Sequence, residues 1–186
     1  MFNLKYVQGE NMFEKFAAQR DSLIAQFQKG DLTKKEFIEE NYSYIQRMNV
    51  KPFKNIDSFE KAIYNYQYYN MMAKYCYLQA REMRKNDKHE DLNRDLMDKV
   101  NFYYRKKDQS THKAVQILDY IGVEAYYIKV SSPNLKENLF EIIFKDYPKI
   151  ILHSRNQWLL NHLKDELVFK EGTRKSLIEN YINEKY

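Results

Sequence analysis

The stretch Asp57–Lys85, DSFEKAIYNYQYYNMMAKYCYLQAREMRK, decides the fold class. It opens with the capping-box pattern Asp57-Ser58-Phe59-Glu60 and contains neither glycine nor proline, so it predicts one long helix. Apolar side chains cover one broad face and an adjoining one. The broad face carries Phe59, Ala62, Ile63, Tyr66, Tyr69, Ala73, Cys76, Tyr77 and Ala80, and the adjoining face carries Tyr64, Tyr68, Met71, Tyr75 and Leu78. A helix that is apolar around most of its circumference lies centrally in a bundle or carries an interface.

Two shorter helices are predicted before this stretch. Residues 11–29 have amphipathic periodicity, Gly30 suits a C-terminal cap, and Thr33-Lys34-Lys35-Glu36 is a capping box that begins the second helix. The segment 29–37 resembles the short helical hairpins of the SHOCT type found at the ends of many bacterial proteins. That resemblance implies a helix, a turn and a helix, and it implies no function. Residues 49–56, with Pro52, are expected to connect to the long helix.

The periodicity changes after Gly122. A fourth helix with Leu92, Leu96, Val100 and Tyr103 on one face is expected before it, and whether that helix breaks near residues 106–111 stays open. Residues 123–130, 139–144, 150–153 and 167–169 favour strands, with 145–148 as a hairpin loop. Ser154-Arg155-Asn156-Gln157 is a capping box for a further helix, and Gly172 and Thr173 open a last one. We therefore expect an α+β protein, in which a helical region (1–122) precedes a small antiparallel sheet with two helices (123–186).

Composition narrows the function classes. The 186 residues suffice for one compact protein, and 31 basic against 26 acidic residues give a net charge of only +5. This excess is too small for a dedicated nucleic-acid binder but leaves anionic partners open. A single cysteine, no leader-like segment and no apolar run of membrane-spanning length predict a cytoplasmic protein without membrane contact. The 17 tyrosines also fit AT-rich codons, as in a low-GC bacterium or a phage.

Motifs for catalysis, metals and cofactors are missing from the sequence. It has no phosphate-binding glycine loop, no HExxH and no GxSxG, so we predict no catalytic residue, metal site or cofactor. His89 beside acidic residues fits a helix start better than a metal site. Cys76 on the apolar stripe is expected to be a buried thiol. The best candidate for a polar pocket is the cluster His153, Arg155, Trp158 and His162, although the sequence favours Trp158 as an anchor of the core between sheet and helix, with His162 at its edge.

Three function classes remain open. The first is an interaction protein that binds a protein partner or a second copy of itself through Tyr64, Tyr68, Met71 and Tyr75, because tyrosine and methionine are enriched in interfaces. The second is a nucleic-acid-binding regulator. Its contacts would come from Tyr104, Arg105, Lys106, Lys107 and Lys113, a segment that mixes aromatic and basic residues. The third is an enzyme with a site near Trp158.

Overall fold

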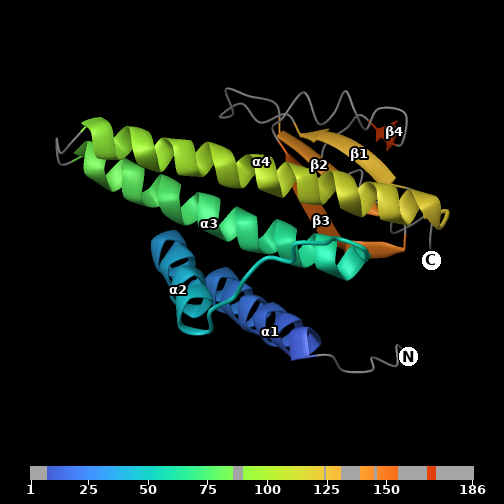
Figure 1. The fold of residues 1–186 in the computed structure, drawn as a ribbon, viewed down its shortest axis with the longest axis horizontal. Helices are drawn as coiled ribbons and strands as arrows, with labels where there is room; N and C mark the ends of the chain where they lie inside the picture. Colours follow the sequence, from blue (N-terminus) through green and yellow to red (C-terminus); the bar gives the residue numbers. More distant parts are fainter. Residues whose placement is uncertain are drawn as a thin grey trace. The chain divides into compact units, whose positions relative to one another are not determined.

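The computed structural model describes residues 8–85, 90–123, 125–130, 139–144, 146–154 and 167–170. Four helices and four strands lie in these ranges (Figure 1). The helices are α1 (Gln8–Lys29), α2 (Lys34–Arg47), α3 (Phe59–Lys85) and α4 (Glu90–Tyr120), and the strands are β1 (Ala125–Val130), β2 (Leu139–Phe144), β3 (Tyr147–Ser154) and β4 (Leu167–Lys170). The structure confirms the α+β class and the mainly helical N-terminal part. The predicted turn at 86–89, with His89, lies outside the described residues, as do the two helices expected around the sheet.

The chain forms two compact units that share the long helices. The helical unit consists of Met1–Asn55 and Ile63–Lys107, and the sheet unit consists of Ile56–Ala62 and Asp108–Tyr186. The sheet unit thus begins before residue 123, the boundary expected from the change of periodicity. That change marks where helix gives way to strand, whereas the last part of α4 already belongs with the sheet.

Local capping signals set the ends of the first two helices. Gly30, with a φ of 83°, donates its N–H to the Phe27 carbonyl, and Asp31 donates to the Gln26 carbonyl, so α1 ends as predicted. The capping box of α2 is complete, because Thr33 Oγ1 accepts from the Glu36 N–H and the Glu36 carboxylate accepts from the Thr33 N–H. These hydrogen bonds satisfy donors that a helix start leaves open.

The cap of α3 differs from the prediction by one residue. Ser58 Oγ accepts the Lys61 N–H at 3.2 Å, and the Ala62 N–H donates to the Ser58 carbonyl. Asp57, predicted as the cap, instead accepts from Lys61 Nζ at 2.7 Å. Either side chain suits the position, and the structure uses the serine as the cap and the aspartate as an ion-pair partner.

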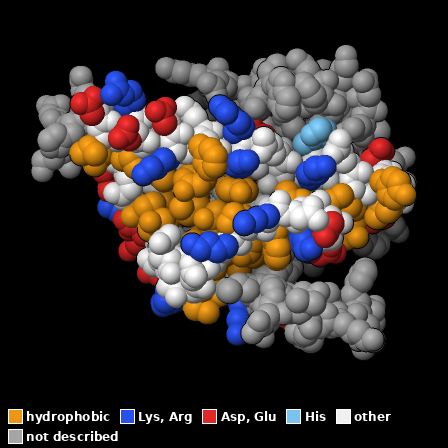
Figure 2. Space-filling model, in the orientation of Figure 1, with side chains coloured by type: hydrophobic (Ala, Val, Ile, Leu, Met, Phe, Trp, Pro, Cys, Tyr) orange, Lys and Arg blue, Asp and Glu red, His pale blue; other side chains and the backbone are white. Residues whose placement is uncertain are grey.

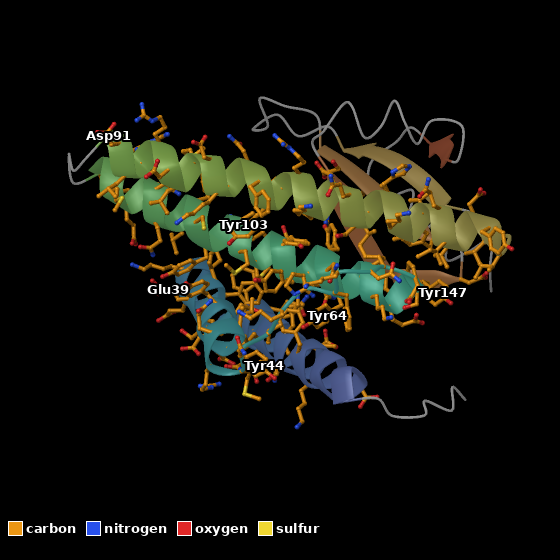
Figure 3. The ribbon with its side chains drawn as sticks, in the orientation of Figure 1. Glu39, Tyr44, Tyr64, Asp91, Tyr103 and Tyr147 are labelled. Atoms are coloured by element: carbon orange, nitrogen blue, oxygen red, sulfur yellow. The ribbon has the colours of Figure 1, made fainter. Side chains whose placement is uncertain are left out.

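Aromatic and aliphatic side chains from three helices fill the core of the helical unit. Its buried members are Phe16, Leu23, Phe37, Ile38, Tyr44, Ile45, Val50, Tyr64, Met71 and Met72. Phe16 packs edge-on against Tyr64, with ring centroids 5.3 Å apart. Tyr64 lies on the side of α3 that faces α1 and α2 (Figure 3). The central place of α3 explains why its apolar surface is so broad.

Helix α4 continues without interruption through residues 106–111, which answers the question that the sequence left open. Gly122, whose φ is 79°, caps its C-terminal end: the Val123 N–H donates to the Leu118 carbonyl and the Gly122 N–H to the Asp119 carbonyl. This pair of bonds is the Schellman motif, which needs a left-handed residue.

The four described strands form a mixed sheet with the order β3-β2-β1-β4. The pairs β1–β2 and β2–β3 are antiparallel as predicted, and β4 adds a parallel pair with β1 that the sequence did not predict. Consecutive hairpins would have kept every pair antiparallel. Residues 155–166, between β3 and β4, are long enough for a crossover to the opposite edge, where β4 runs in the direction of β1.

The β2–β3 connection is tighter than the predicted loop 145–148. Tyr147 already belongs to β3 and pairs with Phe144, next to a register irregularity at Ile143 and Phe144. In the same unit, Phe59 packs edge-on against Phe144 at 5.2 Å. Core side chains of this unit include Ala114, Val115, Leu118, Ile142 and Leu152. Among the described residues, no helix is long and apolar enough to cross a membrane.

Candidate functional site

An unbroken series of ring contacts crosses the surface of the helical unit from α3 to α4. Tyr68 contacts Tyr69 at 5.2 Å between ring centroids, Tyr69 contacts Tyr103 at 6.3 Å, and Tyr103 contacts Phe102 at 5.5 Å. The three tyrosines are partly buried, whereas Phe102 is 50% exposed. Figure 2 shows hydrophobic side chains gathered along α3 with Lys and Arg side chains around them, and Tyr103 lies between α4 and α3 in Figure 3. This aromatic series therefore reaches solvent at Phe102.

Nearby, Tyr42 of α2 stacks on Tyr75 of α3. Their ring centroids are 3.5 Å apart and their planes are 3° from parallel. Burial and the neighbouring phenols of Tyr103, Tyr69 and Tyr42 raise the pKa of Tyr68 to about 12, and burial is also the first cause that raises the pKa of Tyr75. These hydroxyls stay neutral at physiological pH, so the tyrosines offer hydrogen-bonding tips and apolar rings without charge.

The structure separates the four residues predicted as an interface. Tyr64 is 2% exposed and Met71 is 1% exposed, and Tyr64 donates its hydroxyl hydrogen to the Lys51 carbonyl at 3.0 Å. Tyr68 and Tyr75 are partly buried and border the same core. The chain itself thus buries Tyr64 and Met71. Of the four residues, only Tyr68 and Tyr75 keep exposed surface that a partner can contact.

Phe102 lies in a charged stripe along the exposed face of α4. Asp91, Asp95 and Asp98 precede it at helical spacing and are exposed. Lys106 follows one turn later and places its Nζ 5.8 Å from the centroid of the Phe102 ring. The stripe is therefore acidic before Phe102 and basic after it.

The predicted nucleic-acid residues do not share one face. Arg105 and Lys113 are exposed and Lys106 is partly buried, whereas Lys107 is 6% exposed and points at the rings of Tyr66 and Tyr104. The exposed aromatic among these cations is Phe102, not Tyr104. The sequence reading missed Phe102 and the flanking Lys99, although the spacing of residues 99, 102 and 106 on a helix was sufficient to find them.

Of the predicted polar pocket, only His153 is described; Arg155, Trp158 and His162 lie outside the described residues. His153 pairs across the strands with Glu141, and His153 Nε2 lies 3.0 Å from Glu141 Oε1. The next residue, Ser154, donates from Oγ to Asp108 Oδ1 at 2.9 Å. Because adjacent residues of a strand point to opposite faces, Ser154 and His153 do not form a nucleophile and base.

The described ranges contain no cluster of potential metal ligands, and their one thiol is buried. No group of three or more His, Cys, Asp or Glu side chains gathers there. Cys76 is buried, as predicted, and burial raises the pKa of its thiol. A thiol with a raised pKa is a poor nucleophile.

The fold and this surface define an α+β protein with a Tyr-rich helical unit that exposes an aromatic and charged face on α4. The chain belongs to a family of unknown function, DUF6648, whose profile matches residues 6–186. Neither a curated protein nor a solved structure matches the chain.

Proposed function

We propose that the protein is a non-enzymatic, self-associating module whose interface is the exposed face of α4 centred on Phe102. The observation that carries this proposal is the half-exposed Phe102 ring, which ends the aromatic series from α3. A large apolar side chain at the centre of a charged rim has the anatomy of an interface core.

Charge along α4 favours a second copy of the chain as the partner. When two α4 helices pack antiparallel about a twofold axis at Phe102, residues before it in one copy meet residues after it in the other. Asp98 of one copy then lies opposite Arg105 of the other, and twofold symmetry repeats the pair. Both side chains are exposed and lie on the same flank of the Phe102 stripe. Such rim charges fix orientation more than they add affinity.

On the other flank of the Phe102 stripe, like charges weaken the antiparallel pairing. Lys99 of one copy faces Lys106 of the other, which places like charges together across the interface. Each exposed pair changes the free energy by about 0.2–1 kcal/mol, so attraction and repulsion nearly cancel and Phe102 supplies most of the affinity. The expected dimer is therefore weak, and Lys99 limits its affinity.

A charge-swap series tests the antiparallel geometry. Asp98→Arg and Arg105→Asp should each weaken self-association about tenfold, because each variant sets two like-charge pairs in place of two attractive ones. The double variant should recover wild-type affinity, since it restores both pairs with reversed signs. Sedimentation equilibrium over a range of concentrations measures the dissociation constant. A strict monomer at millimolar concentration, or a double variant no better than the single ones, would refute the proposal.

Binding of single-stranded nucleic acid by the same face is the alternative, favoured by Lys99, Arg105 and Lys106 around an exposed ring that can stack on a base. Lys99→Glu distinguishes the two functions by the sign of its effect. It should tighten self-association, because it turns the Lys99–Lys106 repulsion into attraction. It should weaken nucleic-acid binding, because it removes a phosphate contact.

A further inference from the structure

Tyr42 of α2 and Tyr75 of α3 form the closest ring contact among the described residues of the helical unit. Their centroids are 3.5 Å apart and their planes differ by 3°, so the two phenol rings lie face to face with little lateral offset. Aromatic pairs prefer offset or edge-on arrangements with centroids about 4.5–7 Å apart. The packing of α2 beside α3 therefore holds this pair together, rather than the preference of the rings (Figure 1).

An ion bridge and the core fix the two helices on either side of this pair. Lys35 Nζ of α2 lies 2.5 Å from Glu82 Oε1 of α3 and 3.7 Å from Glu39 Oε1 of its own helix. Lys35 precedes Tyr42 by about two helical turns, and Glu82 follows Tyr75 by the same distance. Both tyrosines also pack against the buried core. The ion bridge and the core thus limit how far the two rings can separate.

Ring geometry distinguishes this pair from the other tyrosine contacts. Tyr68 and Tyr69 lie edge-on, with an interplanar angle of 78°, and Tyr69 and Tyr103 are 6.3 Å apart. Parallel rings in contact place carbon atoms of one phenol directly over those of the other, which edge-on or distant rings do not. Tyr42 and Tyr75 are both only partly buried, so solvent reaches them.

We propose that Tyr42 and Tyr75 are the site of an oxidative modification, an intramolecular dityrosine bond that forms when hydrogen peroxide acts through a one-electron oxidant such as a haem peroxidase. Each phenol gives one electron to the oxidant and its hydroxyl proton to water, which leaves two phenoxyl radicals. A carbon–carbon bond then forms between one Cε atom of each ring. The hydrogen on each joined carbon leaves as a proton while the oxygen of the same ring takes one up, so both aromatic rings and both hydroxyls are restored. In total, two electrons and two protons leave the protein and reduce one hydrogen peroxide to two water molecules.

Proximity favours this bond over a bond between two molecules. Radicals that are already in contact couple in an effectively unimolecular step, whereas phenols on different molecules must first meet by diffusion. The product joins α2 to α3 covalently, and such a link restricts the unfolded chain more than the folded one. The site is independent of the proposed self-association, which uses residues of α4.

Peptide mass spectrometry tests the site. Dilute protein is treated at neutral pH with a haem peroxidase and hydrogen peroxide and is then digested with trypsin. Tyr42 lies in the tryptic peptide 36–47 and Tyr75 in the peptide 75–81, so these two peptides should appear as a linked pair that has lost two hydrogen atoms. Tyr42→Phe and Tyr75→Phe keep the rings and hence the packing, and each should lower the yield of this pair about tenfold or more.

A matched control separates proximity from exposure. Tyr77 shares its tryptic peptide with Tyr75 and is 49% exposed, so it would be the preferred site if exposure alone decided. Tyr77→Phe should therefore form the linked pair like the wild type. In an equal mixture of unlabelled and isotope-labelled protein, the linked peptides should both carry the label or both lack it. Absence of the pair, a yield unaffected by Tyr42→Phe or Tyr75→Phe, its loss in Tyr77→Phe, or mainly mixed-label pairs would overturn the proposal.

Discussion

Replacing Lys74 by methionine should raise the protein's free energy of unfolding. Methionine keeps the length of the side chain and removes a charge that is partly withdrawn from water among Arg20, Lys107 and Lys34. The pKa falls from 10.5 to about 8, and one pKa unit corresponds to about 1.4 kcal/mol, so the charged form is disfavoured by at most about 3.5 kcal/mol. Lys74 retains some contact with water, which screens part of this effect. We expect a gain of about 1–2 kcal/mol in the free energy of unfolding at pH 7.

The gain should depend on pH with a definite sign. The folded pKa of Lys74 lies below its unfolded value, so between about pH 8 and 10.5 the unfolded chain binds the additional proton and Lys74 makes stability rise with pH. Below pH 8 the full destabilisation is present. The difference between the variant and the wild type should therefore be constant below about pH 7.5 and shrink toward pH 9.5. Cys76 and Tyr68, whose pKa values are raised by burial, destabilise both proteins equally at high pH and cancel in the difference.

Urea unfolding followed by circular dichroism at several pH values between 6.5 and 9.5 measures this difference. Lys85→Met is the matched control, because Lys85 is exposed on the same helix and its loss should change stability by no more than about 0.5 kcal/mol. A Lys74→Met protein that is less stable than the wild type at pH 7, or a difference that does not shrink by pH 9.5, would show that burial and the neighbouring cations do not destabilise the charged form of Lys74.

Two further predictions concern helix ends. Gly122→Ala should lower the free energy of unfolding by about 1 kcal/mol, because φ is 79° there, and Gly122→Asn should cost less; chemical denaturation of both variants measures this, and equal stability of the alanine variant and the wild type would contradict it. Thr33→Ala should lower it by about 1 kcal/mol through loss of the bond to the Glu36 N–H, whereas Thr33→Ser should be nearly neutral; thermal unfolding of the pair decides, and a neutral alanine variant would exclude a stabilising cap.

Features that depend on a few neighbouring residues were predictable from the sequence. The ends of α1 and α2 follow from Gly30 and from the Thr33–Glu36 box, whose hydrogen bonds close within a few residues. The β1 and β2 strands follow from their residue types. The parallel pairing of β4 was not predictable in this way, because it depends on where the chain crosses the sheet and not on the composition of residues 167–170.

The candidate site on α4 was predictable because one helix supplies its residues. One helical face carries Phe102, Lys99 and Lys106, and their spacing of three and four residues is enough to predict that they are neighbours. Arg20, Lys74 and Lys107 are far apart in the sequence, and only the packing of α1, α3 and α4 places their charges within reach of one another. The sequence assigned Lys107 to a surface because its basic neighbours suggested one, but it lies one turn from Tyr104 on the inward side of the helix.

The abundance of tyrosine in α3 has a physical role at each depth of the helical unit. The fully buried Tyr64 ring fills the core, and its hydroxyl donates a hydrogen bond to the Lys51 carbonyl in the connector. A phenylalanine at this position would leave that carbonyl without the donor. At the margin, Tyr68 and Tyr69 extend the apolar packing outward with hydroxyls that tolerate water. This gradual boundary lets one helix serve both as the centre of the bundle and as the support of the aromatic series that reaches Phe102. If aliphatic side chains took the place of these marginal tyrosines, Phe102 would lose the ring contacts that connect it to α3. In this protein, Tyr103 packs against both Phe102 and Tyr69 and so supports the exposed ring.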